Sequence, residues 1–133
     1  MHLIDTDILV FALRQQPQVL RNFQSRAALR KRMSVISYGE LLYGAARSAR
    51  PQDNAQRVLH IASVIPVIDV TSTIMETFAS IKSELASLGV RLEIMDLLIA
   101  ATARSLDCVL VTNNERHFSK IPGLRLENWT RPV

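Results

Sequence analysis

The segment LIDTDILVFAL, residues 3–13, passes from one apolar run to another through two carboxylates. Its first part favours a buried strand, predicted from His2 to Asp5, and its second part favours a helix from about Ile8 to Arg14. One acid between a strand and a helix is commonly an N-cap. Asp7 needs a further reason, because two acids placed so close together repel each other.

The alternation of strand and helix continues along the chain. Further strands are predicted at 33–37, 67–70, 108–112 and 124–127. Further helices are predicted after Pro17, at 38–48, after Pro51, at 72–88 with Gly89 as its cap, from about Asp96, and as one turn after the fourth strand. This pattern is typical of an α/β fold with a mostly parallel sheet. We therefore expect a sheet of about five strands between two layers of helices, in one domain spanning residues 1–133.

Composition limits the classes of protein to which the chain can belong. The 133 residues are 48% hydrophobic and 21% charged, which is ordinary for a globular protein. The uncharged apolar runs fall well short of the ~20 residues needed to cross a bilayer, so no membrane association is expected. Cys108 is the only cysteine and lies in an apolar run, which favours a buried thiol and a cytoplasmic location.

The chain is basic, with 16 Lys and Arg against 12 Asp and Glu and a net charge of +4. All the basic residues except Lys31, Lys82 and Lys120 are arginines, whose planar guanidinium suits phosphate oxygens. An excess of cations favours a polyanionic partner such as nucleic acid, although surface solvation is the ordinary role of such residues.

Acidic and amide side chains recur where the predicted strands end. Asp5 closes the first strand, Glu40 lies just after the second, and Asn113, Asn114 and Glu115 follow the fourth. Parallel sheets bind ligands beyond the carboxyl ends of their strands, so we expect these side chains along one edge. Asp96 enters its helix from a loop, and its place in the same cluster is an inference from the pattern.

Helix capping is the competing interpretation of each acid taken alone. The segment from Ser37 to Glu40 reads as a capping box, in which Glu40 bonds to the backbone amide of Ser37. Asp96 suits an N-cap or a first helical turn. Capping does not explain why ionisable acids recur at several helix starts. If these carboxylates converge, their repulsion requires a cation, and oxygen ligands alone suit Mg²⁺ or Mn²⁺.

Four segments occur together in one order: LIDTDILVFAL at 3–13, SVISYGELLYGA at 34–45, MDLLIAATARSLDCVLVTNNERHF at 95–118 and IPGLRLENW at 121–129. In this combination the chain resembles the PIN-domain ribonucleases and, within that family, the VapC-type toxins of toxin–antitoxin pairs. The resemblance implies a PIN-like three-layer α/β/α fold and the endonucleolytic cleavage of RNA by metal-activated water.

By this resemblance, the catalytic and metal-binding acids fall on Asp5, Glu40 and Asp96. The implied cation is Mg²⁺, with Mn²⁺ as an expected substitute. Supporting roles fall on five further residues of the same segments: Thr6, Thr112, Asn113, Asn114 and Glu115. Asn114 stands where many members of the family carry a fourth acid, and Asp7 stands where the family usually has Asn.

The resemblance also implies partners: an RNA substrate, a cognate antitoxin protein, and a second copy of the chain in a homodimer. Arg14, Arg91 and Arg116 lie near the site segments and are candidates for contacts with RNA phosphates. Apolar side chains on the first two predicted helices are candidates for the antitoxin surface, with core packing as the alternative. They are Phe11, Leu13, Val19, Leu20 and Phe23.

Two other functions remain open from the residues alone. Asp5-Thr6-Asp7 after an apolar strand resembles the first motif of haloacid dehalogenase-type phosphatases, with Asp5 as nucleophile and Asp7 as general acid, but the later lysine and paired-acid motifs are missing. A non-catalytic RNA-binding module would account for the arginines and leave the acids unexplained. A metal-free acid–base route through histidines is not favoured, and His117 is expected to make a structural hydrogen bond.

Overall fold

Five parallel strands form the centre of the computed structural model, which describes residues 1–133. They are β1 (His2–Ile4), β2 (Lys31–Ser34), β3 (Val67–Ile68), β4 (Val109–Val111) and β5 (Arg125–Glu127). Their order across the sheet is β3-β2-β1-β4-β5, and every neighbouring pair is parallel. The predicted parallel sheet is confirmed, and the three strands that precede the candidate site residues are adjacent at its centre.

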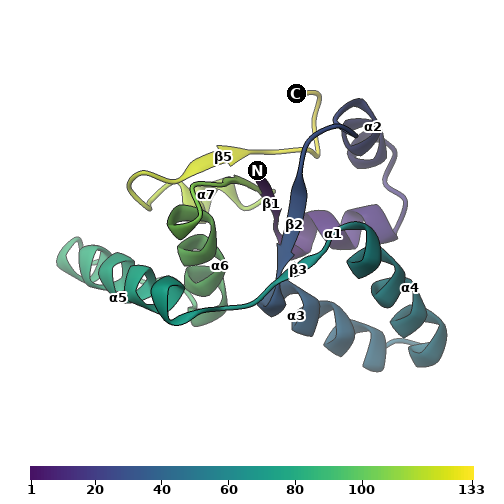
Figure 1. Ribbon diagram of the computed structural model, residues 1–133, viewed down its shortest axis with the longest axis horizontal. Helices are drawn as coiled ribbons and strands as arrows, with labels where there is room; N and C mark the ends of the chain where they lie inside the picture. The colour runs from purple at the N-terminus through teal and green to yellow at the C-terminus, as the bar shows by residue number, and fades with distance from the viewer.

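Seven helices cover the two faces of the sheet, which confirms the three-layer arrangement (Figure 1). One side carries α1 (Thr6–Leu13), α2 (Pro17–Ser25), α3 (Val35–Ala46) and α4 (Pro51–Val64). The other carries α5 (Ser72–Ser87), α6 (Ile94–Ser105) and the short α7 (Glu115–Phe118). No helix is long and apolar enough to span a membrane.

Side chains that point alternately to the two faces of the sheet contribute to two separate apolar cores. Leu3 and Leu110 point into the core beneath α5 and α6, whereas the next residues, Ile4 and Val111, point into the core beneath α1 to α4. Successive strand side chains face opposite sides of a sheet, so each short strand supplies both layers. Cys108 is 2% exposed in the first core, as its apolar surroundings predict.

The boundary between β2 and α3 differs from the prediction. The strand ends at Ser34 rather than Ser37, because the Ser34 hydroxyl accepts the backbone N–H of Ile36 (3.1 Å) and caps α3. The predicted capping box from Ser37 to Glu40 is therefore wrong, and both residues lie inside the helix. The early end of β2 also limits β3 to Val67–Ile68, whose last partner across the ladder is Ser34.

The start of α1 and the connection from α5 to α6 decide where the remaining acids lie. Asp5 is the N-cap of α1, so the helix starts at Thr6, earlier than predicted. Gly89, with φ +70°, ends α5 in the left-handed conformation that its predicted cap role requires. The chain then enters α6, which runs back toward the start of β4. The N-terminus of α6, with Asp96 in its first turn, thus lies at the carboxyl edge of the sheet.

Candidate active site

Asp5 is the most buried acid at the carboxyl edge of the sheet, with 5% of its surface exposed. One carboxylate oxygen, Oδ1, accepts the backbone N–H of Thr6 (2.8 Å). The other, Oδ2, accepts the hydroxyl of Thr112 (2.7 Å), which closes β4 beside β1. The strand pairing therefore fixes the position of both oxygens, one of them through a direct hydrogen bond from Thr112.

Asp7 lies in the first turn of α1 and is held by two backbone donors. Its Oδ1 accepts the N–H of Ile8 (2.7 Å), and its Oδ2 accepts the N–H of Asn113 (3.1 Å). The turn after β4 consequently contacts both acids of the opening segment, one through a side chain and one through the backbone. The second acid of the opening segment thus has structural partners on both sides of the site.

Glu40 comes to the same edge from the second turn of α3. The Thr6 hydroxyl donates to Glu40 Oε1 (2.7 Å) and lies 2.8 Å from the hydroxyl oxygen of Ser37. Ser37 is fully buried, and it holds this contact because Ser34, and not Ser37, caps the helix. Sequence analysis missed this role of Ser37, since its position suited a cap equally well.

Asp96 is partly buried in the first turn of α6. Its pKa is raised by burial first, then by the negative charges of Glu40 and Glu93, and it is lowered by His117. These influences indicate that Asp96 lies near Glu40. His117 makes no side-chain hydrogen bond, which contradicts the structural role expected for it, and it lies instead near Asp96.

Burial and mutual repulsion shift the pKa values of the aspartates in the same direction. The pKa of Asp5 rises to about 7, first because the carboxylate is buried and next because Asp7 is nearby, with a smaller contribution from Asp96. The pKa of Asp7 is also raised, mainly by burial and partly by Asp96. None of these three acids forms an ion pair with an arginine or lysine. Neither arginine nor lysine therefore neutralises these three aspartates in an ion pair.

The donor set fits a hard divalent cation in its chemistry. It consists of carboxylate and hydroxyl oxygens, which Mg²⁺ and Mn²⁺ prefer, and a bound cation would offset the burial and the carboxylate repulsion that raise the pKa values of Asp5 and Asp96. No three His, Cys, Asp or Glu side chains are already arranged around one point. Glu40 in particular is exposed and engaged by Thr6.

Two of the predicted supporting residues have other partners. The Glu115 carboxylate accepts hydrogen bonds from Asn128 (3.1 Å) and Arg131 (2.9 Å), which lower its pKa. The backbone N–H of Asn114 donates to the Thr112 hydroxyl oxygen (2.9 Å) and shapes the turn.

The three arginines predicted to bind RNA lie in different surroundings. Arg14 shares a hollow of about 240 Å³ with Glu40, between α1, α3 and α4. Arg91 lines a separate hollow on the connection from α5 to α6, and Arg116 is exposed on α7. The structure thus brings only Arg14 into a shared cavity with a candidate ligand.

Known proteins resemble this chain over nearly its whole length. The PIN domain family model matches residues 2–124. Ribonuclease VapC2 of Haemophilus influenzae is 33% identical over 129 residues, which cover 96% of this chain and 97% of that protein. The tRNA(fMet)-specific endonuclease VapC of Salmonella typhimurium is 34% identical over 127 residues, covering 96% of each chain. The crystal structure of VapBC2 from Rickettsia felis, bound to promoter DNA, matches with TM-score 0.90 and 30% identity, covering 96% of this chain and 98% of that one.

The fold, the acidic edge and these matches define a PIN-domain protein. Within that family, the chain belongs to the VapC ribonucleases, the toxins of VapBC toxin–antitoxin systems. The predicted family and class of enzyme are confirmed, and the phosphatase and the non-catalytic module are set aside.

Proposed function

We propose that this VapC ribonuclease cleaves RNA by means of a divalent cation, Mg²⁺ or Mn²⁺, held by Asp5, Glu40 and Asp96. The observation that carries the proposal is the pair Asp5 and Asp96, whose pKa values are raised chiefly by burial and neither of which forms an ion pair with an arginine or lysine. When bound, such a cation activates water at neutral pH and neutralises charge on the phosphate.

The remaining side chains of the edge orient these acids. Thr112 fixes one oxygen of Asp5, and Thr6 holds Glu40 toward the N-terminus of α1. Asn113 and Asn114 support the turn that carries Thr112, while Glu115 braces the same turn through Arg131. We propose that these residues position the acids, and that only the three acids contact the cation.

RNA phosphates approach along the arginines that border the acids. Arg14 lies in the hollow that also contains Glu40 and Arg57, so a phosphate bound there would lie next to the acidic edge. Arg91 and Arg116 are exposed and suit phosphates farther along the strand. One relative is named for its specificity for tRNA(fMet), which makes transfer RNA the first substrate to test.

The products of cleavage distinguish this chemistry from a metal-free route. Attack by water on phosphorus leaves 5′-phosphate and 3′-hydroxyl ends, because the ribose hydroxyl takes no part. We expect purified protein to cut transfer RNA in Mg²⁺ or Mn²⁺ and to be inactive in EDTA. Full cleavage in EDTA, or products with 2′,3′-cyclic phosphates, would contradict the proposal. Sequencing the 5′ ends of cellular RNA after a brief pulse of expression identifies the target.

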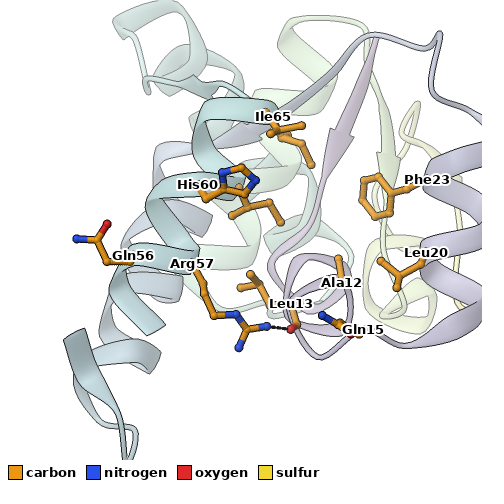
Figure 2. Close-up of a pocket in the computed structure, with 11 residues that line it drawn as sticks. Ala12, Leu13, Gln15, Leu20, Phe23, Gln56, Arg57, His60 and Ile65 are labelled. Atoms are coloured by element: carbon orange, nitrogen blue, oxygen red, sulfur yellow. Dashed lines mark hydrogen bonds between the residues drawn. The ribbon is translucent and has the colours of Figure 1, made fainter. Parts of the chain in front are cut away.

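An apolar groove supplies a surface for the antitoxin. The groove, of about 490 Å³, lies between α1, α2 and α4 (Figure 2). Leu13, Leu20 and Phe23 line one side, and Ile61 and Val64 of α4 line the other. At its end, Arg57 donates a hydrogen bond to the Leu13 carbonyl. Of the five apolar residues predicted from the first two helices, three thus reach the groove, whereas Val19 is buried in the core.

The groove is proposed to receive an amphipathic helix of the antitoxin, since the Rickettsia felis structure is of a VapBC complex. Val64 is 66% exposed there, and substitution by Glu places a charge on the apolar surface. We expect Val64→Glu to lose the co-expressed antitoxin in affinity purification while melting at the wild-type temperature. Leu59→Glu, on the same helix but outside the groove, is the matched control. Equal retention of the antitoxin by both variants would place its binding surface elsewhere.

We also propose that the toxin forms a homodimer. Sedimentation of the purified chain is expected to give twice the 14.9 kDa mass of one copy. A monomer across the accessible concentration range would contradict the dimer and leave the nuclease assignment intact.

A further inference from the structure

Asn128 lies directly after β5 and is 5% exposed. Its side-chain amide nitrogen donates to Asn113 Oδ1 and to Glu115 Oε2, each at 3.1 Å. Its amide oxygen accepts the backbone N–H of Thr130 (3.0 Å) and the Thr130 hydroxyl (2.7 Å). Both hydrogens of the amide are therefore directed at the turn that follows β4.

The segment that carries Asn128 is itself fixed to the body of the protein. The buried side chain of Asn22, on α2, donates to the carbonyls of Trp129 and Arg131, both at 2.9 Å. Trp129 is fully buried and packs edge-on against Phe23, with 5.1 Å between ring centroids. In Figure 1 this end of the chain accordingly lies beside α2. Asn128 thus braces the turn from a rigid support.

The braced turn is the one that holds both acids of the opening segment. Its Thr112 hydroxyl donates to Asp5, its Asn113 N–H donates to Asp7, and its Asn114 N–H donates back to Thr112. A displacement of Asn113 therefore reaches Asp5 through Thr112. Asn128 also lies beyond residue 124, where the match to the PIN domain ends.

We propose that Asn128 is a positioning residue of the nuclease: its amide nitrogen fixes the turn at 112–115, and this turn sets the orientation of Asp5. The expected effect of Asn128 on RNA cleavage rests on the proposed function. Its effect on the turn rests only on the hydrogen bonds described above. Outer residues that orient a ligand commonly contribute about 10–100-fold to activity.

The isosteric variant Asn128→Asp replaces both donors by a carboxylate oxygen that faces the Glu115 carboxylate, and it retains the acceptor used by Thr130. We expect kcat for RNA cleavage to fall about tenfold or more, the scale of an outer-shell contact. We expect KM to change by less than about twofold, since no RNA-binding side chain is altered. Hydrogen exchange of the Asn113 amide, followed by NMR, should accelerate. Arg125→Gln, which removes an exposed ion pair with Asp107 at the other end of β5, is the control and should change none of these quantities.

A double variant tests the hydrogen bond itself. Asn128→Asp combined with Glu115→Gln exchanges donor and acceptor, so the bond between the two side chains can form again in the opposite direction. Recovery of kcat and of Asn113 protection relative to Asn128→Asp supports the proposal. A single variant with unchanged kcat and unchanged exchange would overturn it.

The cleavage of RNA and the fixing of the turn by Asn128 can be tested independently. If the wild-type chain cuts no RNA under any metal condition, the proposed function fails, and the exchange of the Asn113 amide alone decides whether Asn128 fixes the turn. Accelerated exchange in Asn128→Asp, with recovery in the double variant, then supports the positioning role. Unchanged exchange rejects it.

Discussion

Carboxylates on the helical surface and carboxylates at the carboxyl edge of the sheet have opposite environments. On the surface, Arg104 donates two hydrogen bonds to Glu84 at 3.0 and 3.1 Å, and this guanidinium lowers the pKa of the acid. Glu115 likewise has a lowered pKa, owing first to Asn128 and then to Arg131. Each of these acids has a cationic partner in solvent, where an ion pair contributes little to stability.

At the edge of the sheet the acids are more buried and lack such partners. Burial and neighbouring carboxylates raise the pKa values of Asp5, Asp7 and Asp96. A chain with 16 basic residues leaves its most buried carboxylates without an arginine or lysine. Such an arrangement destabilises the chain on its own, so it indicates a functional requirement for charge at this place.

The largest effect is expected for the most buried acid of the edge. Asp5→Asn keeps the shape of the side chain and its ability to cap α1, but it removes the charge needed to hold a cation. RNA cleavage should fall by at least about 100-fold, the upper range for loss of a group at a metal or charge-stabilising site. The rate of cleavage with Mg²⁺ at neutral pH measures the effect.

The control for this substitution is a surface acid. Asp107 pairs with Arg125 and has φ +54°, a conformation that Asn tolerates, so Asp107→Asn should fold and cleave like the wild type. A fully active Asp5→Asn protein would show that Asp5 is only a helix cap.

An intermediate effect is expected in the way the stability of the metal-free protein depends on pH. Between about pH 4 and pH 7 the folded chain keeps a proton on Asp5 that the unfolded chain has released, because the folded pKa is about 7 against 3.8. The free energy of unfolding should therefore fall as pH rises through this interval, by up to about 1.4 kcal/mol per pH unit. Glu84, whose pKa is lowered, has the opposite effect on the free energy of unfolding: its ion pair stabilises the folded chain at neutral pH, and this stabilisation is lost only on acidification.

Urea unfolding of the metal-free protein at a series of pH values measures this slope. Asp5→Asn should flatten it between pH 4 and pH 7, whereas Asp107→Asn should leave it unchanged. A stability that rises steadily over the same interval would mean that folding does not raise the pKa of Asp5.

The smallest effect is expected for Asp7. In Asp7→Asn one side-chain oxygen remains, and it can still accept the N–H of Asn113 at the expense of the N–H of Ile8, so the turn after β4 keeps its anchor. Cleavage should stay within about tenfold of the wild type, because the change removes only an outer hydrogen-bonding charge. Cleavage rates measured in parallel on Asp5→Asn and Asp7→Asn show whether the two aspartates contribute differently to activity. An equal, large loss in both would make the two aspartates a functional pair.

Much of the fold and part of the site follow from the sequence. The ends of adjacent parallel strands share one edge, so the positions of Asp5 and Thr112 follow once the strands are recognised. The place of Asp96 could not be derived from the strand ends alone, because it depends on α6 running back toward β4. The choice between Ser34 and Ser37 as the cap of α3 could not be made from propensity, since both residue types suit a cap and packing decided between them.

The remaining features depend on contacts between distant segments. The apolar groove needs α4 packed beside α1 and α2, and the sequence of the first two helices shows only one of its walls. Asn128 reaches the site because the residues after β5 fold back over Asn22 and the turn at 113–115. Neither contact leaves a local pattern in the sequence.

Titration of Mn²⁺ into the protein by calorimetry tests the central claim, that the uncompensated carboxylates are a cation site. At pH 8, above the pKa of about 7 of Asp5, the acids are ionised and the wild type should bind the metal. Asp107→Asn should bind it equally well, and Asp5→Asn should bind it at least about tenfold more weakly. Equal Mn²⁺ affinity in Asp5→Asn and the wild type, or no binding by the wild type, would contradict the account.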